Sequence, residues 1–415
     1  MSERSAAQPI SLSERIYVID VLRGLAVCGI LIGNMQWNSG YGFMPPAMAE
    51  AWPMYDKVTQ YLVHVFVEGK FYSIFSLLFG FGFALQIDRA TQRGDANASV
   101  FKRRLFWLLV IGVIHASIWA GDILSVYALM GFILLLFRQK SDESLLRWAL
   151  SLMVVPVIYF AIILALFLAF APPDTASVVA KAQTDMFQSA MNVVPNGGFF
   201  QIIREYNVGM VAGRWAGLFL QMRLPKILAM FLLGFYAYRK GYFQHPLDHQ
   251  PFIRKVTVYG LGLGLVCNPL FAWFAHSEAD FPPSYNGLIG IVMYGIGVPA
   301  LAVGIAAAVL TLWQNASWRK VLGVFTPVGR MALTNYLMQT AISLFIFYGW
   351  GLGYYGKVGP LTATLVALAI FAAQVVISTI WLKYFAYGPM EWIWRQLTYK
   401  RRLNILKPQA EPISS

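Results

Sequence analysis

The sequence predicts an all-α integral membrane protein of about ten transmembrane helices, with both termini on the cytoplasmic side. Three observations lead to this fold class: the composition, the length of the apolar runs and the placement of basic residues between them. Hydrophobic residues make up 58% of the 415 positions and charged residues only 12%, about half the charged fraction of a typical soluble domain. Most of the chain is therefore expected to face lipid or other helices.

Ten apolar runs in the sequence are long enough to cross a hydrocarbon core of about 30 Å as helices. They lie at 18–35, 71–87, 105–121, 122–138, 148–171, 225–239, 256–274, 287–312, 330–350 and 361–386. No small-residue cleavage pattern follows the first run, so we interpret it as a permanent helix and not as a signal peptide. Residues 14–402 are expected to form a single membrane domain, between a disordered N-terminal tail at 1–13 and a C-terminal tail at 403–415.

Basic residues occur in alternate connections between these runs. The connections rich in Lys and Arg are 89–104, 138–147, 239–255, 319–320 and 400–407. With ten spans they all fall on one side, which the positive-inside rule makes cytoplasmic. We therefore expect a multi-pass membrane protein, with the lipid bilayer as its first partner. The formal net charge of +13 follows from this topology and does not indicate nucleic-acid binding.

One long external segment, 172–223, separates the fifth and sixth runs. It contains an amphipathic stretch from Phe199 to Met222, which is expected either to lie in the membrane interface or to cap a cavity.

Ionisable residues inside membrane helices are costly unless they are paired or hydrated, and so they mark candidate functional sites. In the first helix, Asp20 and Arg23 are three residues apart and share a face. Asn34 returns to within about 40° of Asp20, at roughly 100° per residue, near the outer end. The plainer interpretation is a buried ion pair that fixes helix register, with Asn34 as an interhelical hydrogen bond.

The third run ends with His115, Trp119 and Asp122, at helical spacings that would place them on one face at the external end. A carboxylate near an imidazole can orient it and raise its basicity, as a general base requires. The alternative is a histidine packed near the interface without a chemical role.

His64 and Glu68 form an i, i+4 pair just before the second run, and Lys70 follows closely. Two such ligands do not make a metal site. The two cysteines, Cys28 and Cys267, each lie inside an apolar run, so we predict neither a disulfide framework nor a metal centre.

The ninth run begins with Arg330 and continues with Asn335, Gln339 and Ser343 on one face, a ladder that alone would serve to hold helices together. The predicted topology sorts the polar residues into two layers and implies a path between them. The cytoplasmic layer contains Asp20, Arg23 and Arg330, and the external layer contains Asn34, His64, Glu68, His115 and Asp122.

Four motifs in order carry a family resemblance: RIYVIDVLRGLAVCGILIGN at 15–34, RRLFWLLVIGVIHASIWAGDIL at 103–124, GRMALTNYLMQ at 329–339 and YGPMEWIWRQLTY at 387–399. Together they resemble the YeiB-like bacterial membrane family, domain of unknown function 418, over nearly the whole chain. That family is more distantly similar to the transmembrane acyltransferases, among them the bacterial polysaccharide acyltransferases and the lysosomal heparan-glucosaminide acetyltransferase.

The element shared with the acyltransferases is an Asp, an Arg three residues later and a polar residue fourteen after the Asp, here Asp20, Arg23 and Asn34. At the last position of this element the polysaccharide acyltransferases have a His. The lysosomal enzyme has an Asn at that position, and its catalytic His follows eleven residues later. Here Pro45 stands at that point. A catalytic base would therefore come from elsewhere, and His115 and His64 are the candidates.

The resemblance and the two polar layers imply acyl transfer from a cytoplasmic donor to a small-molecule or envelope-glycan acceptor at the external face. His115 would be the base, Asp122 would orient it, and Asn34 would hold a carbonyl oxygen. Asp20, Arg23, Arg330 and Asn335 would line the donor side; acyl-CoA is the expected co-substrate, with no tightly bound cofactor.

Two alternatives remain open. The first is a secondary transporter or exporter of a small amphipathic solute, with the same residues as a proton-coupled site. The second is a noncatalytic membrane partner protein.

Overall fold

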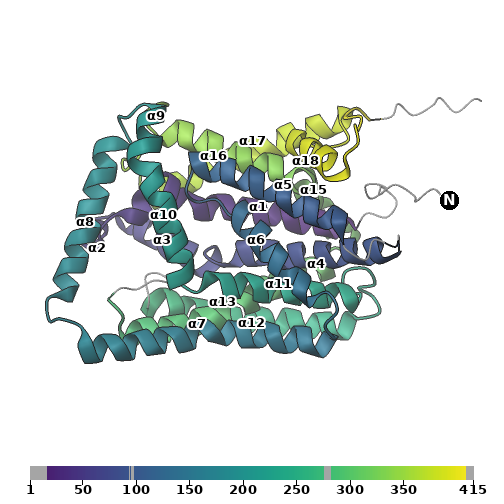
Figure 1. The fold of residues 1–415 in the computed structure, drawn as a ribbon, viewed down its shortest axis with the longest axis horizontal. Helices are drawn as coiled ribbons and strands as arrows, with labels where there is room; N and C mark the ends of the chain where they lie inside the picture. Colours follow the sequence, from purple (N-terminus) through teal and green to yellow (C-terminus); the bar gives the residue numbers. More distant parts are fainter. Residues whose placement is uncertain (1–15, 93, 95–97, 275–281, 408–415) are drawn as a thin grey trace, which may run out of the picture.

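The structure, a computed structural model, describes residues 16–92, 94, 98–274 and 282–407. Within these residues the secondary structure is helical, apart from one isolated β-bridge between Phe385 and Leu406. Most long helices lie side by side along the longest axis of the molecule, and α8 (Thr175–Val193) and α10 (Val208–Leu220) cross one end of this bundle (Figure 1). The predicted N-terminal tail, 1–13, lies outside the described residues.

Each of the ten predicted apolar runs contains a helix. These helices are α1 (Tyr17–Asn38), α4 (Lys70–Gln92), α5 (Ser99–Ile118), α6 (Leu124–Leu134, continued by η2, Leu135–Phe137), α7 (Asp142–Phe170), α11 (Arg223–Arg239), α12 (Gln250–Phe274), α13 (Tyr285–Leu312), α16 (Ala332–Phe347) and α17 (Pro360–Tyr384). The shorter elements are η1 (Tyr41–Phe43), α2 (Pro46–Ala49), α3 (Met54–Phe66), α9 (Phe199–Ile202), η3 (Ile203–Asn207), α14 (Ala316–Leu322), η4 (Gly323–Phe325), α15 (Thr326–Arg330) and α18 (Pro389–Tyr399).

Six helical stretches in the described part of the chain are long and apolar enough to cross a membrane by themselves: α1, α3 with α4, α7, α12, α13 and α17. A seventh arises if the bent pair of α10 and α11, which meet at 67°, is one span. Helices α6 and α16 are apolar but shorter, and α5 contains Lys102, Arg103 and Arg104 in its first two turns. The chain is thus a multi-span helical membrane protein.

Helix α1 lies at the centre of the bundle and is held closely by α15. A Cβ added at Gly24 would lie 2.1 Å from the carbonyl oxygen of Phe325, and one added at Gly329 would lie 1.8 Å from that of Asp20. Backbones this close exclude any side chain, as small residues do at membrane helix interfaces. The two glycines therefore fix η4 and α15 against the first helix.

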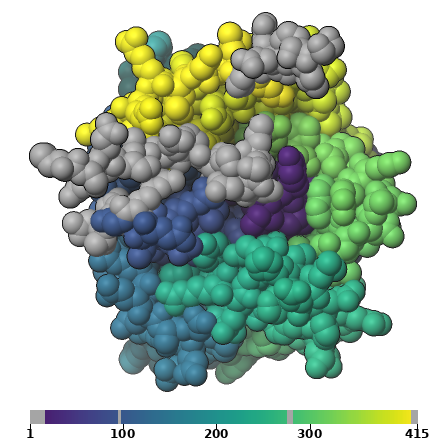
Figure 2. Space-filling model, turned by 90° about the vertical axis from the view of Figure 1, so that its right-hand side faces the viewer, coloured from purple at the N-terminus to yellow at the C-terminus, as the bar shows by residue number. Residues whose placement is uncertain are grey.

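Helix α18, near the end of the described chain, lies at the same end of the bundle as the start of α1 (Figure 1). Figure 2 views this end, with α1 in purple near its middle and the α18 region in yellow above. Basic segments meet here as well, since Arg239 donates to the carbonyl oxygens of Arg138 at 2.9 Å and Lys140 at 2.5 Å. Likewise, the guanidinium of Arg103 donates to the carbonyl oxygen of Thr398 at 3.0 Å.

Two segments differ in detail from the sequence-based expectation. The first part of the predicted C-terminal tail, 403–407, pairs with the end of α17, where Lys407 N donates to Tyr384 O at 3.1 Å and Ala386 N donates to Ile405 O at 2.8 Å; 408–415 lie outside the described residues. The external segment 172–223 is helical for most of its length, and its residues 203–207 form a π-helical turn.

Candidate functional site

A cavity of about 630 Å³ lies at the end of the bundle crossed by α8 and α10. Its wall is formed by the C-terminal half of α1, the junction of α3 and α4, the connection between α5 and α6, and the segment from α8 to the start of α11. The polar residues on this wall include Asn34, Glu68, Asn207, Arg214, Arg223 and Tyr336. Its volume is that of ligand sites in proteins generally.

The amphipathic segment 199–222 covers this cavity. Residues from Glu205 to Gln221 line it, so the segment caps a cavity, which is one of the two placements that its amphipathic pattern allows. Helix α10 turns sharply into α11 at Met222, whose φ of 48° is left-handed. Such a conformation is strained for a residue with a side chain and is often found beside functional sites.

Of the pair formed by His64 and Glu68, Glu68 is the residue that lines the cavity. Its carboxylate accepts a hydrogen bond from Nδ1 of His64, and His64 lies behind it, outside the residues that line the wall. The pair does not share one continuous helix, because α3 ends at Phe66 and Gly69 has a φ of +82°. Lys70 is fully buried, and its ammonium donates to the carbonyl oxygen of His64 at 2.6 Å.

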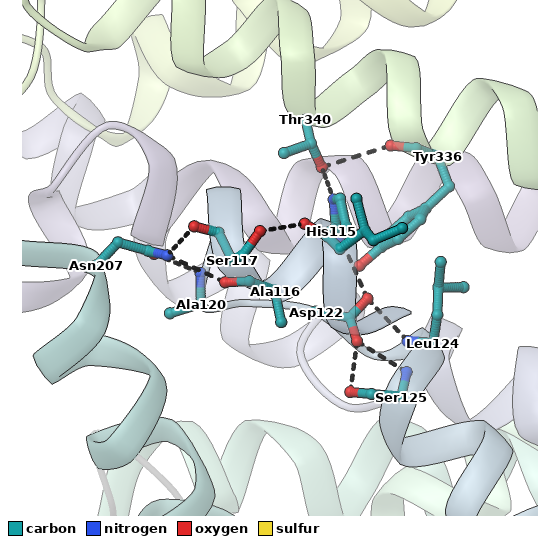
Figure 3. Close-up of polar contacts among 11 residues, drawn as sticks. His115, Ala116, Ser117, Ala120, Asp122, Leu124, Ser125, Asn207, Tyr336 and Thr340 are labelled. Atoms are coloured by element: carbon teal, nitrogen blue, oxygen red, sulfur yellow. Dashed lines mark hydrogen bonds and ion pairs between the residues drawn. The ribbon is translucent and has the colours of Figure 1, made fainter. Parts of the chain in front are cut away.

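His115 and Asp122 are hydrogen bonded, as their pairing in the sequence suggested, but by a different geometry. Helix α5 ends at Ile118 and Trp119 is extended, so Asp122 returns to the imidazole from the following loop and not from the same helix face. Nδ1 of His115 lies 2.8 Å from Asp122 Oδ1 and Nε2 lies 3.0 Å from Thr340 Oγ1 (Figure 3). The carboxylate also accepts hydrogen bonds from Leu124 N and from both Ser125 N and Ser125 Oγ.

Each ring nitrogen of His115 thus has one partner, the Asp122 carboxylate at Nδ1 and the Thr340 hydroxyl at Nε2. The Thr340 hydroxyl also lies 3.5 Å from the carbonyl oxygen of Tyr336, to which it can donate. A hydroxyl, an imidazole and a carboxylate in this order form the arrangement that activates nucleophiles. None of these three residues lines the cavity, however. The cavity is lined instead by Trp119 and Tyr336, whose rings pack on the imidazole at 5.7 and 5.2 Å between ring centroids.

Asn207 is a site residue that sequence reasoning gave no role. It lies in the π-helical turn, lines the cavity and caps the C-terminal end of α5 with three hydrogen bonds (Figure 3). Its amide nitrogen donates to the carbonyl oxygens of Ala116 at 3.0 Å and Ser117 at 2.9 Å, and its amide oxygen accepts from Ala120 N at 2.9 Å. The signal in the sequence is an asparagine inside an apolar helix, which is costly there unless it is bonded.

Arg214 and Arg223 are the second set of residues that the sequence did not assign. They line the cavity from either side of the bend at Met222. The simpler interpretation of two arginines in an amphipathic segment is that they lie at the membrane interface. The 67° bend between α10 and α11 is what brings both arginines to the same cavity.

The residues expected on the donor side lie apart from this cavity. Arg23 donates to Asp20 at 3.3 Å, with Asp20 2% exposed. On α1 the cavity wall begins at Gly29, and the turns before it are packed among apolar side chains such as Leu22 and Ala26. In the described part of the chain, the cavity therefore does not join the two polar layers.

Arg330 ends α15 at the same packed end of α1. Asn335 is buried, and its amide nitrogen donates to Ser378 Oγ at 3.0 Å. Gln339 donates to Gln374 Oε1 at 2.8 Å, and Gln374 donates to the Asn335 carbonyl oxygen at 2.9 Å. This ladder holds α16 to α17, which agrees with the plainer interpretation of the ninth run.

Among the described residues, no three His, Cys, Asp or Glu side chains gather in a way that would hold a metal ion.

Comparison with known proteins gives a consistent result. The model of the family "Protein of unknown function (DUF418)" matches residues 237–401. Uncharacterized protein YxaH of Bacillus subtilis is 34% identical over 412 residues, which cover 95% of this chain and 97% of that protein. Uncharacterized protein YeiB of Escherichia coli is 28% identical over 406 residues, covering 93% and 97%. No solved structure matches significantly. The resemblance drawn from the four motifs is thereby confirmed.

Proposed function

Because this chain belongs to the DUF418 family of membrane proteins, we propose that it is an acyltransferase-like enzyme whose acceptor binds in the cavity beneath α8 and α10. The observation that carries the proposal is that Asn34 and Glu68 share the wall of one cavity of about 630 Å³. A carbonyl-binding amide and a carboxylate base beside a ligand-sized space are what an acyl transfer site needs.

The proposed topology has ten spans in the bacterial cytoplasmic membrane and both termini on the cytoplasmic side. The contacts of Arg103 and Arg239 support it, because they gather basic segments at one end of the bundle. The cavity then opens toward the external half of the membrane.

In the proposed reaction, Glu68 takes the proton of an acceptor hydroxyl or amine, and His64 holds the carboxylate in place. The acceptor atom attacks the thioester carbonyl of acyl-CoA, the carbon–sulfur bond breaks, and the departing thiolate takes up a proton. Asn34 donates to the carbonyl oxygen as charge develops there. His115 does not border the cavity, so we give it a positioning role and not a catalytic one. Held by Asp122 and Thr340, its imidazole supports the rings of Trp119 and Tyr336, which do line the cavity.

Acyl-CoA would be a loosely held co-substrate that arrives from the end where Asp20, Arg23 and Arg330 lie. Because packed apolar side chains separate that end from the cavity, delivery of the acyl group requires the helices around α1 to move apart. Asn335 is left out of this proposal, since its side chain is engaged between helices.

The test uses detergent-purified protein, acetyl-CoA or palmitoyl-CoA, and an envelope-glycan extract as acceptor. Release of the CoA thiol and transfer of a labelled acyl group are measured together. We expect Glu68→Gln to slow transfer by about 10²-fold or more. The control is Asp185→Asn, at an exposed residue of α8 that pairs with Lys181, and it should leave the rate unchanged. Equal rates for wild type and Glu68→Gln would remove Glu68 as the base, and no thiol release by wild type would remove acyl transfer.

A second candidate, transport of a small amphipathic solute, is favoured by the broken helix at the cavity. Discontinuous helices often form the binding sites of secondary transporters, and the bend between α10 and α11 is such a break. Uptake of a fluorescent amphipathic dye into proteoliposomes under an imposed proton gradient is the test. Accumulation that collapses when the gradient is abolished would favour transport over acyl transfer.

A further inference from the structure

The last described residues, 383–407, form a basic segment at the end of the last spanning helix. Helix α17 is long and apolar enough to cross the membrane and ends at Tyr384, so the residues that follow it lie near one membrane surface. In Figures 1 and 2 the region of α18 lies at the edge of the bundle end where α1 begins. We refer to residues 383–407 as the C-terminal segment.

The C-terminal segment is folded back on itself. Helix α18 ends where Lys400 takes a left-handed φ of 53°, a conformation that commonly ends helices and redirects the chain. The returning strand is then held at two points: Lys407 N donates to Tyr384 O at 3.1 Å, and Nε1 of Trp392 donates to Leu403 O at 2.7 Å. Its basic residues are therefore fixed on the protein surface next to the membrane.

Positive charge in this segment is not balanced by negative charge. Six basic residues and one acidic residue lie between 383 and 407. The acidic one, Glu391, points inward and accepts hydrogen bonds from Leu333 N and the Thr334 hydroxyl. Five of the basic side chains are exposed, and in the described part of the chain none of the five forms an ion pair: Lys383, Lys400, Arg401, Arg402 and Lys407.

The backbone pairing also brings like charges together. It places Lys407 close to the end of α17, where Lys383 lies. Like charges that are held close repel one another unless an anion lies between them. Basic residues in the last turn of a helix can interact with its dipole, but Arg401, Arg402 and Lys407 lie beyond the end of α18. Their arrangement therefore favours an external anion.

The side of α18 that faces α5 is positive as well. The guanidinium of Arg103 donates to Thr398 O at 3.0 Å, and that of Arg104 lies 3.9 Å from the ring centre of Trp394. Helix α5 thus supplies further positive charge and no carboxylate to the segment through these contacts. An anion at the C-terminal segment would be attracted by both groups of basic residues.

Apolar side chains are exposed among these charges. Tyr384 is 65% exposed, Ile393 38% and Leu406 53%. Exposure of such side chains to water is unfavourable, whereas at a membrane surface they can contact acyl chains while nearby basic groups reach the headgroups. A small soluble anion such as phosphate would leave them uncovered. The combination therefore fits a lipid better than a soluble ligand.

We propose that the C-terminal segment binds an anionic phospholipid, whose phosphate group contacts Arg401, Arg402 and Lys407 and whose acyl chains cover the exposed apolar side chains. Arginine suits this ligand, because its guanidinium binds two phosphate oxygens at once. The inference goes beyond the proposed function, since the segment lies at the opposite end of the bundle from the cavity and its lipid is independent of what the cavity binds.

Binding is measured on the full chain, purified in detergent and titrated with phospholipids, by native mass spectrometry, which counts the lipids bound to each molecule. The probes are dioleoyl phosphatidylglycerol and dioleoyl phosphatidylcholine, which share their acyl chains and differ in net charge. We expect the first phosphatidylglycerol to bind about tenfold more tightly than the first phosphatidylcholine. Equal affinities would overturn the proposal.

Two matched double variants locate the site. Arg401→Gln with Arg402→Gln should weaken phosphatidylglycerol binding about tenfold. The control, Arg254→Gln with Lys255→Gln, removes two adjacent, exposed charges from the N-terminal part of α12 and should leave the affinity unchanged. Equal losses in both variants would show that net charge alone attracts the lipid, and the C-terminal segment would be wrong as its site.

Two further measurements complete the test. If the arginine variant fails to purify as a monodisperse protein, Lys383→Gln with Lys407→Gln takes its place, with the same expected loss; unchanged affinity would overturn the proposal. Glycerol 3-phosphate at millimolar concentration carries the phosphate without acyl chains. We expect it to leave phosphatidylglycerol bound, and complete displacement would replace the lipid with a soluble phosphate as the ligand.

Discussion

The two ends of the helix bundle differ in what surrounds their polar residues: packed apolar side chains at one end and a cavity at the other. At the end where α1 begins, the backbones of α1 and α15 touch through Gly24 and Gly329. Asp20, the partner of the partly exposed Arg23, is buried there beside packed apolar residues. At the other end, Asn34, Glu68 and two arginines border a cavity of about 630 Å³. An ionisable residue in a membrane helix is a functional candidate by default. Whether it borders a cavity is what distinguishes a residue that can bind a ligand from one that stabilises the fold.

The largest effect is expected where backbones meet. Gly329→Ala would place a methyl group 1.8 Å from the Asp20 carbonyl oxygen, so α15 must move away from α1. We expect a loss of about 3 kcal/mol or failure to fold. Gly213→Ala on the cavity wall, where a Cβ would meet nothing within 4 Å, should be neutral or slightly stabilising, because alanine favours helix by up to about 1 kcal/mol. Thermal melts of the two variants in detergent decide, and equal melting temperatures would contradict the contrast.

Asp122 should behave as a structural residue although it lies near the cavity. Asp122→Ala removes the acceptor of His115, Leu124 and Ser125 together, and we expect a loss of about 3 kcal/mol. Asp122→Asn retains one acceptor and should lose less. Glu68→Gln, on the cavity wall, should stay within about 1 kcal/mol of wild type in the same unfolding titration. A Glu68 variant less stable than Asp122→Ala would reverse the assignment.

The ladder between α16 and α17 gives a smaller effect. Gln339→Leu or Gln374→Leu alone leaves a buried amide without its partner, at a loss of about 1–2 kcal/mol. The double variant should recover most of it, because both polar groups are then gone. A double-mutant cycle measures this coupling, and strictly additive losses would show that the two amides act independently.

The smallest effect concerns Glu391, which lies outside the spanning helices and accepts hydrogen bonds from the backbone nitrogens of Leu333 and Thr334. Burial raises the pKa of this carboxyl above its ordinary value, although the hydrogen bond from the Thr334 side chain opposes the shift. The folded chain then keeps a proton that the unfolded chain loses, so this contribution to stability is present below the unfolded pKa and falls as pH rises through the folded pKa. Glu391→Gln should flatten that part of a melting curve measured against pH; an unchanged slope would exclude Glu391 as its source.

The features that depend on local spacing could be predicted from the sequence. Each apolar run contains a helix because hydropathy alone decides what can lie in lipid, and the Asp20–Arg23 contact follows from their i, i+3 spacing. The Thr340 partner of His115 lies 225 residues away, and no local pattern connects the two. Arg214 and Arg223 reach one cavity only through the bend at Met222, whose left-handed backbone nothing in the residue type indicates.

The part of the cavity wall that α10 forms also has a consequence for how such proteins can diverge. Positions packed against a neighbouring helix resist change, since any new atom must displace one already there. Gly209 and Gly213 line the cavity and adjoin open space, so a methyl or isopropyl group at either would narrow the cavity while the surrounding packing stays as it is. We therefore expect the shape of this cavity to be easily altered in this architecture, because the fold leaves these two positions unconstrained.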